Sequence, residues 1–162
     1  VVVYCQPVWF VRGHIPEPFA VGEPLQLLIA DTGIASPTKV TVGDVRKGWL
    51  ADPDRYNSLF DRIHEIAVSA RIAIEQGDLA RLGPLMNDNQ ILLAELGVSS
   101  PELDQLCSAA SKAGALGAKL SGGGRGGNMI ALVGSGKRPG ARQPLEEVGA
   151  IRVVEMVLHG KL

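Results

Sequence analysis

The sequence is poor in cysteine and in aromatic side chains, with two Cys, two Trp, two Tyr and three Phe among 162 residues. Cys5 and Cys107 are far apart in sequence, each lies in an apolar neighbourhood, and neither has the paired spacing of a metal or redox motif. We expect two buried, reduced thiols, which suits a cytoplasmic protein. The three histidines, His14, His64 and His159, are scattered, and no metal site is predicted.

Excess charge and long apolar runs are also missing. Sixteen basic and seventeen acidic residues leave a net charge of -1, which favours neither nucleic acid nor an anionic membrane as a partner. No segment approaches the roughly 18 apolar residues of a membrane span, and the start lacks the basic region of a signal peptide. The apolar fraction of 46% is typical of a globular domain with a core. The first residue is valine within a strand-like run, so we expect a piece of a longer protein.

Hydrophobic periodicity and helix-start signals divide the chain into strands and helices. Strand-like runs cover Val1 to Val11 and Leu25 to Ala30, and these two could pair as a hairpin. The start signals are Ser36-Pro37, Asp52-Pro53, Asp78 and the stretch Ser99, Ser100, Pro101, Glu102, in which either serine could be the cap. The helices are predicted over 38–50, 53–76, 78–96 and 101–113, with a kink or restart at Gly83-Pro84.

The carboxy-terminal third adds strands on both sides of a glycine-rich loop. "GALGAKLS" and "NMIALV" read as strands, a weaker helix follows over 142–148, and a last strand covers 151–158. The order of two strands, four helices, strand, loop, strand, helix and strand predicts an α+β fold in which helices pack on a mostly antiparallel sheet.

The segment Gly122–Gly127, here called the Gly loop, places five glycines around Arg125. It matches neither the P-loop pattern nor the dinucleotide-binding fingerprint. Consecutive backbone N–H groups can form an anion-binding concavity, to which Ser121 would add a hydroxyl and Arg125 a charge. A flexible connection between strands, with Arg125 facing solvent, is the alternative interpretation. Lys119 is expected to pair at a strand edge or to extend toward solvent.

Three segments together resemble a known family. "PLQLLIADTGIASPTKVTVGDV", "LMNDNQILLAELGVSSPELDQLC" and "GALGAKLSGGGRGGNMIALV" resemble the carboxy-terminal half of a GHMP-family small-molecule kinase. The Gly loop is similar to the family motif Lys-Leu-Thr/Ser-Gly-Ala-Gly-Gly-Gly-Gly. Gly123 replaces the usual Ala and should leave room near the acceptor, and Arg125 replaces a usual Gly.

The resemblance implies a ferredoxin-like α+β domain over residues 34–162, with residues 1–33 as strands from the end of a preceding amino-terminal domain. It implies ATP and Mg²⁺ as cofactors and phosphorylation of the 5-hydroxyl of mevalonate, for isoprenoid synthesis, by a cytoplasmic enzyme that could be a homodimer. The partners are then the small-molecule substrate and the amino-terminal domain, without nucleic acid or membrane. The implied substrate- or phosphate-binding residues are Thr38, Ser121, Gly122, Gly123, Gly124 and Arg125.

No catalytic residue is assigned to this chain. The family's Gly-Leu-Gly-Ser-Ser-Ala loop for ATP and its Pro-Ser-Gly-x-Asp stretch with the catalytic Asp have no counterpart in the sequence, so we expect the chain alone to be inactive. Asn87 and Gln90 lie one turn apart and could face a ligand or cap a kink. The alternatives are another acceptor, such as phosphomevalonate or homoserine, or a non-catalytic ferredoxin-like module that binds a small anion.

Overall fold

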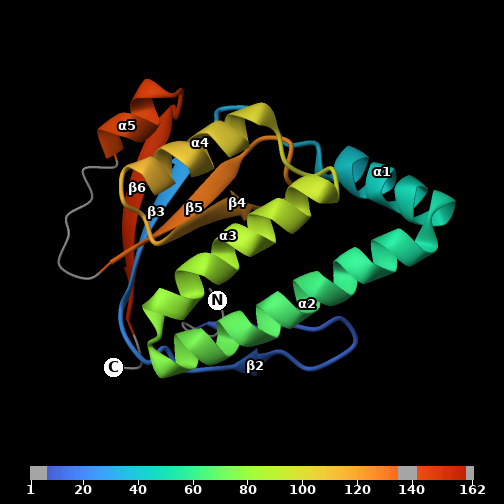
Figure 1. Ribbon diagram of the computed structural model, residues 1–162, viewed down its shortest axis with the longest axis horizontal. Coiled ribbons are helices and arrows are strands. Elements are labelled where there is room, and N and C mark those ends of the chain that lie inside the picture. The colour runs from blue at the N-terminus through green and yellow to red at the C-terminus, as the bar shows by residue number, and fades with distance from the viewer. Residues whose placement is uncertain (1–6, 135–141, 160–162) are drawn as a thin grey trace.

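A computed structural model describes residues 7–134 and 142–159, and every strand pair in it is antiparallel. A two-stranded sheet joins β1 (Val8–Trp9) to β2 (Glu17–Pro18), and a four-stranded sheet has the order β4-β5-β3-β6 (Figure 1). The α+β fold with a mostly antiparallel sheet is therefore confirmed. The bounds of the larger sheet's strands are β3 (Leu25–Asp31), β4 (Gly117–Ser121), β5 (Asn128–Val133) and β6 (Arg152–Leu158).

The helices begin where the start signals predict. Asp52 accepts a hydrogen bond from Arg55 N at the start of α2, and Asp78 accepts one from Arg81 N at the start of α3. Of the two serines before Pro101, Ser100 is the cap of α4. Helix α3 runs through Pro84 as one helix, and no restart is seen there. The helices are α1 (Thr38–Ala51), α2 (Pro53–Gln76), α3 (Leu79–Glu95), α4 (Pro101–Lys112) and α5 (Arg142–Glu147).

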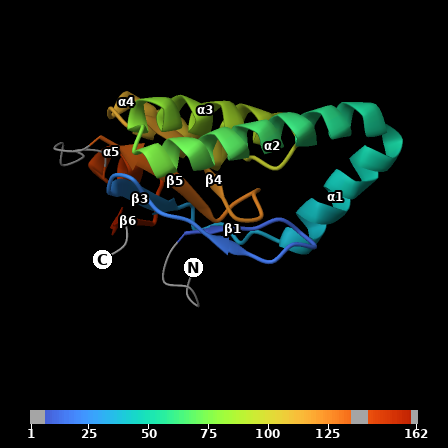
Figure 2. The same cartoon turned by 90° about the horizontal axis from the view of Figure 1, so that it is seen from below.

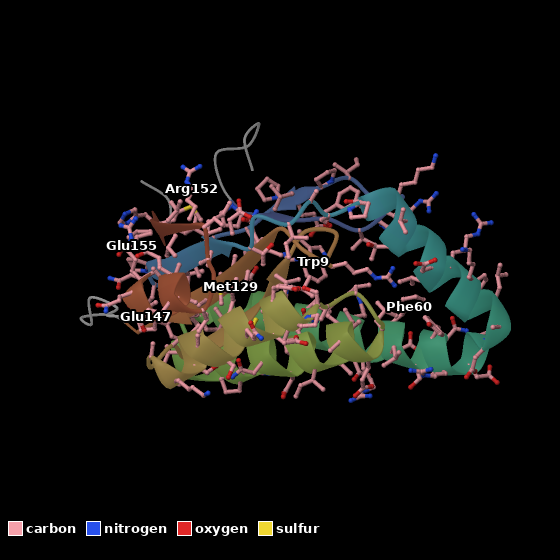
Figure 3. All side chains as sticks on the ribbon, turned by 90° about the horizontal axis from the view of Figure 1, so that it is seen from above. Trp9, Phe60, Met129, Glu147, Arg152 and Glu155 are labelled. Carbon is pink, nitrogen blue, oxygen red and sulfur yellow. The ribbon has the colours of Figure 1, made fainter. Side chains whose placement is uncertain are left out.

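One face of the larger sheet forms the main core. Alternate residues of the strands point to the same face, and on this face Leu28 of β3 lies opposite Ala131 of β5. These residues pack in one buried cluster with Leu103 and Leu106 of α4. Figure 3 shows the fully buried Met129 in the layer between the strands and the helices. Cys107 of α4 is also buried, and this desolvation raises the pKa of its thiol to about 12; Cys5 lies outside the described residues.

The free edge of β4 is covered by side chains of α3. Asn87 Oδ1 accepts a hydrogen bond from Ala118 N at 2.9 Å, and Gln90 Oε1 accepts one from Leu120 N at 2.8 Å. Gln90 Nε2 donates to Ser99 Oγ and Asp104 Oδ1, both at 2.9 Å. An uncovered edge strand leaves backbone groups without partners. The polar cluster of the MNDNQ segment therefore has a structural role at the edge of the sheet.

The amino-terminal strands pair differently from the prediction. The run Val8–Trp9 pairs with Glu17–Pro18, and Val1 to Gln6 lie outside the described residues. Leu25–Asp31 does not form a hairpin with the first run, because it lies inside the larger sheet between β5 and β6. The predicted division at residue 33 would cut this sheet, so β3 belongs with the elements that follow it. The assignment of the preceding segment to another domain stays a prediction.

Helices α1 and α2 form an arm beside the sheet, and α1 rises from the level of the strands to the far end of α2 (Figure 2). The apolar side chains of α1 are only partly buried, since Val42 is 61% exposed and Trp49 is 37% exposed. Val45 packs against the main core, and Thr41 is the one buried residue of the helix. Helix α1 is consequently anchored mainly through its first turns.

Candidate functional site

The Gly loop connects β4 to β5 at the end of the sheet nearest the start of α1 (Figure 1). Four of its glycines have positive φ angles, from 74° at Gly127 to 137° at Gly126. Residues other than glycine rarely adopt such φ angles, so the glycines allow the chain to turn sharply here. Their backbone polar groups then determine what the loop can bind.

Some of the loop's backbone groups are used to attach it to neighbouring segments. Gly127 N donates to Ile34 O at 2.9 Å, and Gly127 O accepts hydrogen bonds from the backbone N–H and the hydroxyl of Thr32. Ser36 Oγ donates to Gly124 O. The sequence predicted Ser36 as the cap of α1, which is wrong, because Pro37 is the N-cap and no side chain caps that helix.

Other amides of the loop have no partner in the described part of the chain. No residue in that part accepts a hydrogen bond from the N–H groups of Gly122, Gly123, Gly124 or Gly126. Gly124 and Gly126 are buried, whereas Gly122 is exposed and Gly123 is partly exposed. Gly122 and Gly123 directly follow Ser121, and two adjacent N–H groups in such an exposed stretch are suited to an anion such as a phosphate group.

Thr38 lies directly against Gly123. A Cβ atom built on Gly123 would lie 2.5 Å from Thr38 Oγ1 and 3.1 Å from Thr38 Cβ. The sequence predicted empty room at Gly123, but the side chain of Thr38 occupies that room. The first residue of α1 and the Gly loop thus face one another, and the Thr38 hydroxyl adds a donor or acceptor to the amides of the loop.

Arg125 connects the Gly loop to two other segments. Its Nη1 atom donates to Asp44 Oδ2 of α1 at 2.6 Å, its Nε atom donates to Gly97 O at 3.0 Å, and its backbone N–H donates to Val98 O at 2.8 Å. Hydrogen bonding to Arg125 and then to Lys47 holds the pKa of Asp44 below its ordinary value. The binding role predicted for Arg125 remains a prediction, and its guanidinium already has two protein partners.

Lys119 lies on the strand that enters the loop. Its Nζ atom donates to Leu120 O at 2.7 Å, and burial lowers the pKa of the amine. The side chain also lines a cavity of about 260 Å³ between the β1–β2 hairpin, α2 and α3, beside Trp9, Phe19 and Met86. This cavity has mostly apolar walls and is not suited to a phosphate group.

The described residues contain no group of three or more His, Cys, Asp or Glu side chains that could hold a metal ion. Asp44 is the acidic residue paired with the loop's arginine, and it also pairs with Lys47 at 3.3 Å. The donor set therefore fits the phosphate part of a nucleotide better than it fits Mg²⁺. None of the described helices is long and apolar enough to span a membrane.

Comparison with known families identifies the domain. The family model described as "GHMP kinases C terminal" matches residues 70–151, which include α3, α4 and the whole Gly loop. This chain belongs to the GHMP kinase family. The match covers about half of the chain, and the family's domain includes the strands on both sides of the loop.

Several curated relatives within the GHMP kinase family are mevalonate kinases. The chain is 42% identical over 127 residues to the mevalonate kinase of Aeropyrum pernix, which covers 78% of this chain and 39% of that protein. It is 39% identical over 113 residues to the mevalonate kinase of Pyrococcus furiosus, covering 67% of this chain and 34% of that protein. The chain spans well under half the length of these relatives.

A solved structure of the same family agrees with the fold in detail. The mevalonate kinase of L. major, solved in complex with R-mevalonate, matches with a TM-score of 0.84 and 33% identity. The match covers 94% of this chain and 48% of the L. major chain. The chain therefore aligns with about half of that mevalonate kinase, and the predicted family and fold are confirmed.

Proposed function

We propose that the whole protein to which this chain belongs transfers the γ-phosphoryl group of ATP to the 5-hydroxyl of mevalonate. The structural observation that carries this proposal is the Gly loop, in which the amides of Gly122 and Gly123 have no acceptor in the described part of the chain and Gly123 lies against the side chain of Thr38. The similarity to mevalonate kinases supports mevalonate as the acceptor. Isoprenoid synthesis in the cytoplasm is the corresponding setting.

The Gly loop would act through its backbone. Phosphoryl transfer depends on positioning and on stabilising negative charge that shifts among the phosphate oxygens. Fixed N–H dipoles do this without reorganising during the reaction. We assign this role to the amides of Gly122 and Gly123, with the hydroxyls of Ser121 and Thr38 as further contacts to the phosphate or the acceptor.

Gly124 and Arg125 have a different proposed role within the same site. Gly124 is buried, its carbonyl oxygen is bound by Ser36, and a Cβ atom there would collide with Val98 O. Only the resemblance to the family motif supports a contact between Gly124 or Arg125 and a phosphate group. We propose that these two residues chiefly hold the loop in place.

ATP would be bound only in part by this chain. When Mg²⁺ is bound with ATP, it neutralises phosphate charge and orients the phosphoryl group. The described residues offer no set of carboxylates for the ion, so we place its ligands and the catalytic carboxylate elsewhere in the whole protein. This chain contributes one wall of the site, and we expect it to be inactive alone.

A coupled assay of ADP release tests the function. We expect the full-length protein to turn over with ATP, Mg²⁺ and mevalonate, and this chain alone to be silent. Turnover with phosphomevalonate or homoserine in place of mevalonate would change the assigned acceptor. Silence of a folded full-length protein with all three acceptors would overturn the kinase function and favour an anion-binding module.

A matched pair of threonine variants tests the site. Thr38→Val removes the hydroxyl that faces Gly123, and we expect kcat to fall on the order of a hundredfold, as for other lost transition-state donors. Thr41→Val lies one turn away, where the hydroxyl is buried without a partner among the described residues, and we expect activity to be retained. Equal activity in the two variants would show that the Thr38 hydroxyl has no role in catalysis.

A further inference from the structure

Arg125 adopts a backbone conformation that is unfavourable for arginine. Its φ angle is 57°, and it is the one residue other than glycine with a positive φ in the described part of the chain. Glycine would take this conformation without steric cost, whereas a side chain with a Cβ atom is strained there. A strained residue persists when surrounding contacts hold it in place.

Arg125 contacts two segments outside the Gly loop. The backbone N–H and Nε bond to Val98 O and Gly97 O in the turn between α3 and α4, and Nη1 bonds to Asp44 on α1. The guanidinium and the carboxylate are both about one-third exposed, so the ion pair is only partly shielded from water. Arg125 therefore ties the Gly loop at once to the α3–α4 turn and to α1.

Near the loop, α1 is otherwise held by the buried Thr41 and by Val45, which packs against the main core. Thr41 is its one buried residue, and its first turn has no side-chain cap. Thr38, at the start of the helix, lies against Gly123, while Asp44 lies six residues further along. Holding Asp44 therefore restrains the helix at a second point, near its middle, and limits how far Thr38 can move from the loop.

We propose that Arg125 and Asp44 form a clasp that positions the start of α1 against the Gly loop, and that Arg125 is a positioning residue for the Thr38 hydroxyl. The clasp itself is a property of this fold. Its effect on catalysis rests on the proposed kinase function. The separation between the Thr38 hydroxyl and the amides of Gly122 and Gly123 is the quantity that the clasp controls.

Amide hydrogen exchange on this chain tests the clasp without any ligand. Arg125→Gly removes the side chain and relieves the backbone strain, and Asp44→Asn removes the charge on α1. We expect each variant to lower the protection of the hydrogen-bonded amides of Gly127 and Thr41 roughly two- to fivefold, the scale of a partly exposed ion pair. The double variant should lose no more protection than the single variants, because both break the same contact.

Lys47→Ala is the matched control. Lys47 also pairs with Asp44, at 3.3 Å, but it lies on the same helix and does not reach the loop. We expect unchanged protection at Gly127 and Thr41 in this variant. A loss of protection equal to that of Arg125→Gly, or no loss in Asp44→Asn, would overturn the clasp. Circular dichroism establishes that each variant is folded before exchange is compared.

Kinetics of the full-length protein separate the clasp from the proposed function. We expect Arg125→Gly to lower kcat about tenfold with a smaller change in the KM for mevalonate, because misplaced donors lose transition-state stabilisation. Lys47→Ala should keep normal kinetics. If exchange shows the clasp but the unmodified protein has no kinase activity, the function is wrong and the clasp stands. Normal exchange in Arg125→Gly with an active kinase would reject the clasp alone.

Discussion

Strand β4 and the Gly loop that follows it differ in whether their backbone amides have hydrogen-bond partners. Along the strand edge, Asn87 and Gln90 of α3 accept hydrogen bonds from the amides of Ala118 and Leu120. Two residues past Leu120, the amides of Gly122 and Gly123 have no acceptor in the described part of the chain. The first region is closed by helix side chains, and the second is left open.

The difference shows how an edge that is closed for stability can adjoin a loop whose amides are left without protein partners. Buried N–H groups without partners cost free energy, so the edge beside α3 must be satisfied within the protein. Accessible N–H groups can bond to water or to an anion, and a loop that presents them loses little stability. A ligand site can therefore begin directly where the closed edge ends.

The largest expected effect on stability comes from disturbing the close packing of α3 against the start of β4. A Cβ atom on Gly83 of α3 would collide with Leu116 O just before β4, so Gly83→Ala should lower the free energy of unfolding by about 3 kcal/mol. Gly43→Ala is the matched control on α1, where a Cβ atom has open space, and we expect it to raise stability by roughly 0.5–1 kcal/mol. Urea unfolding of both variants measures this contrast. Equal stabilities would mean that the approach of α3 to β4 is not tight.

The next effect concerns the amides at the closed edge. Gln90→Leu puts an apolar side chain of similar size in place of the amide. The change removes the acceptor of Leu120 N and the donor to Ser99 and Asp104, so we expect a loss of about 2 to 3 kcal/mol in the free energy of unfolding. The control is Gln105→Leu on the exposed face of α4, with a change below about 0.5 kcal/mol. A mild effect at Gln90 would show that water replaces its hydrogen bonds.

The smallest expected effect is the pH dependence of stability that arises from Asp44, the partner of Arg125 in the Gly loop. Hydrogen bonding to Arg125 and Lys47 lowers the pKa of Asp44 from its ordinary 3.8, so its ionised form is favoured in the folded state. This contribution to stability is present above that ordinary value and is lost as pH falls through the lowered value. The stability difference between the unmodified chain and Asp44→Asn should thus shrink in acid. A difference that is constant from neutral pH to below pH ~3 would contradict the ion pair.

Local sequence signals predicted the helices well because capping is a local interaction. Asp52, Asp78 and Ser100 each bond to a backbone N–H three residues ahead, which spacing alone can indicate. Ser36 has the same residue type before a proline but bonds to Gly124, 88 residues away. No local rule separates these cases, because the competing acceptor comes from another part of the chain.

The binding residues of the candidate site stay a prediction, but the structure tests how the predicted residues lie relative to one another. The Gly loop and Thr38 were both recognised from the motif, and the structure brings them together. The room predicted at Gly123 was wrong because Thr38 fills it. The partnership of Arg125 with Asp44 joins residues 81 positions apart, and no signal in the sequence indicated it.

The sequence by itself determined the family and the helix starts, because these depend on side-chain types at short spacing. The tertiary structure decided that β3 lies between β5 and β6, and it decided which loop amides stay accessible. Both outcomes depend on contacts between distant segments. Such contacts form only when burial of the core faces brings the strands and helices together.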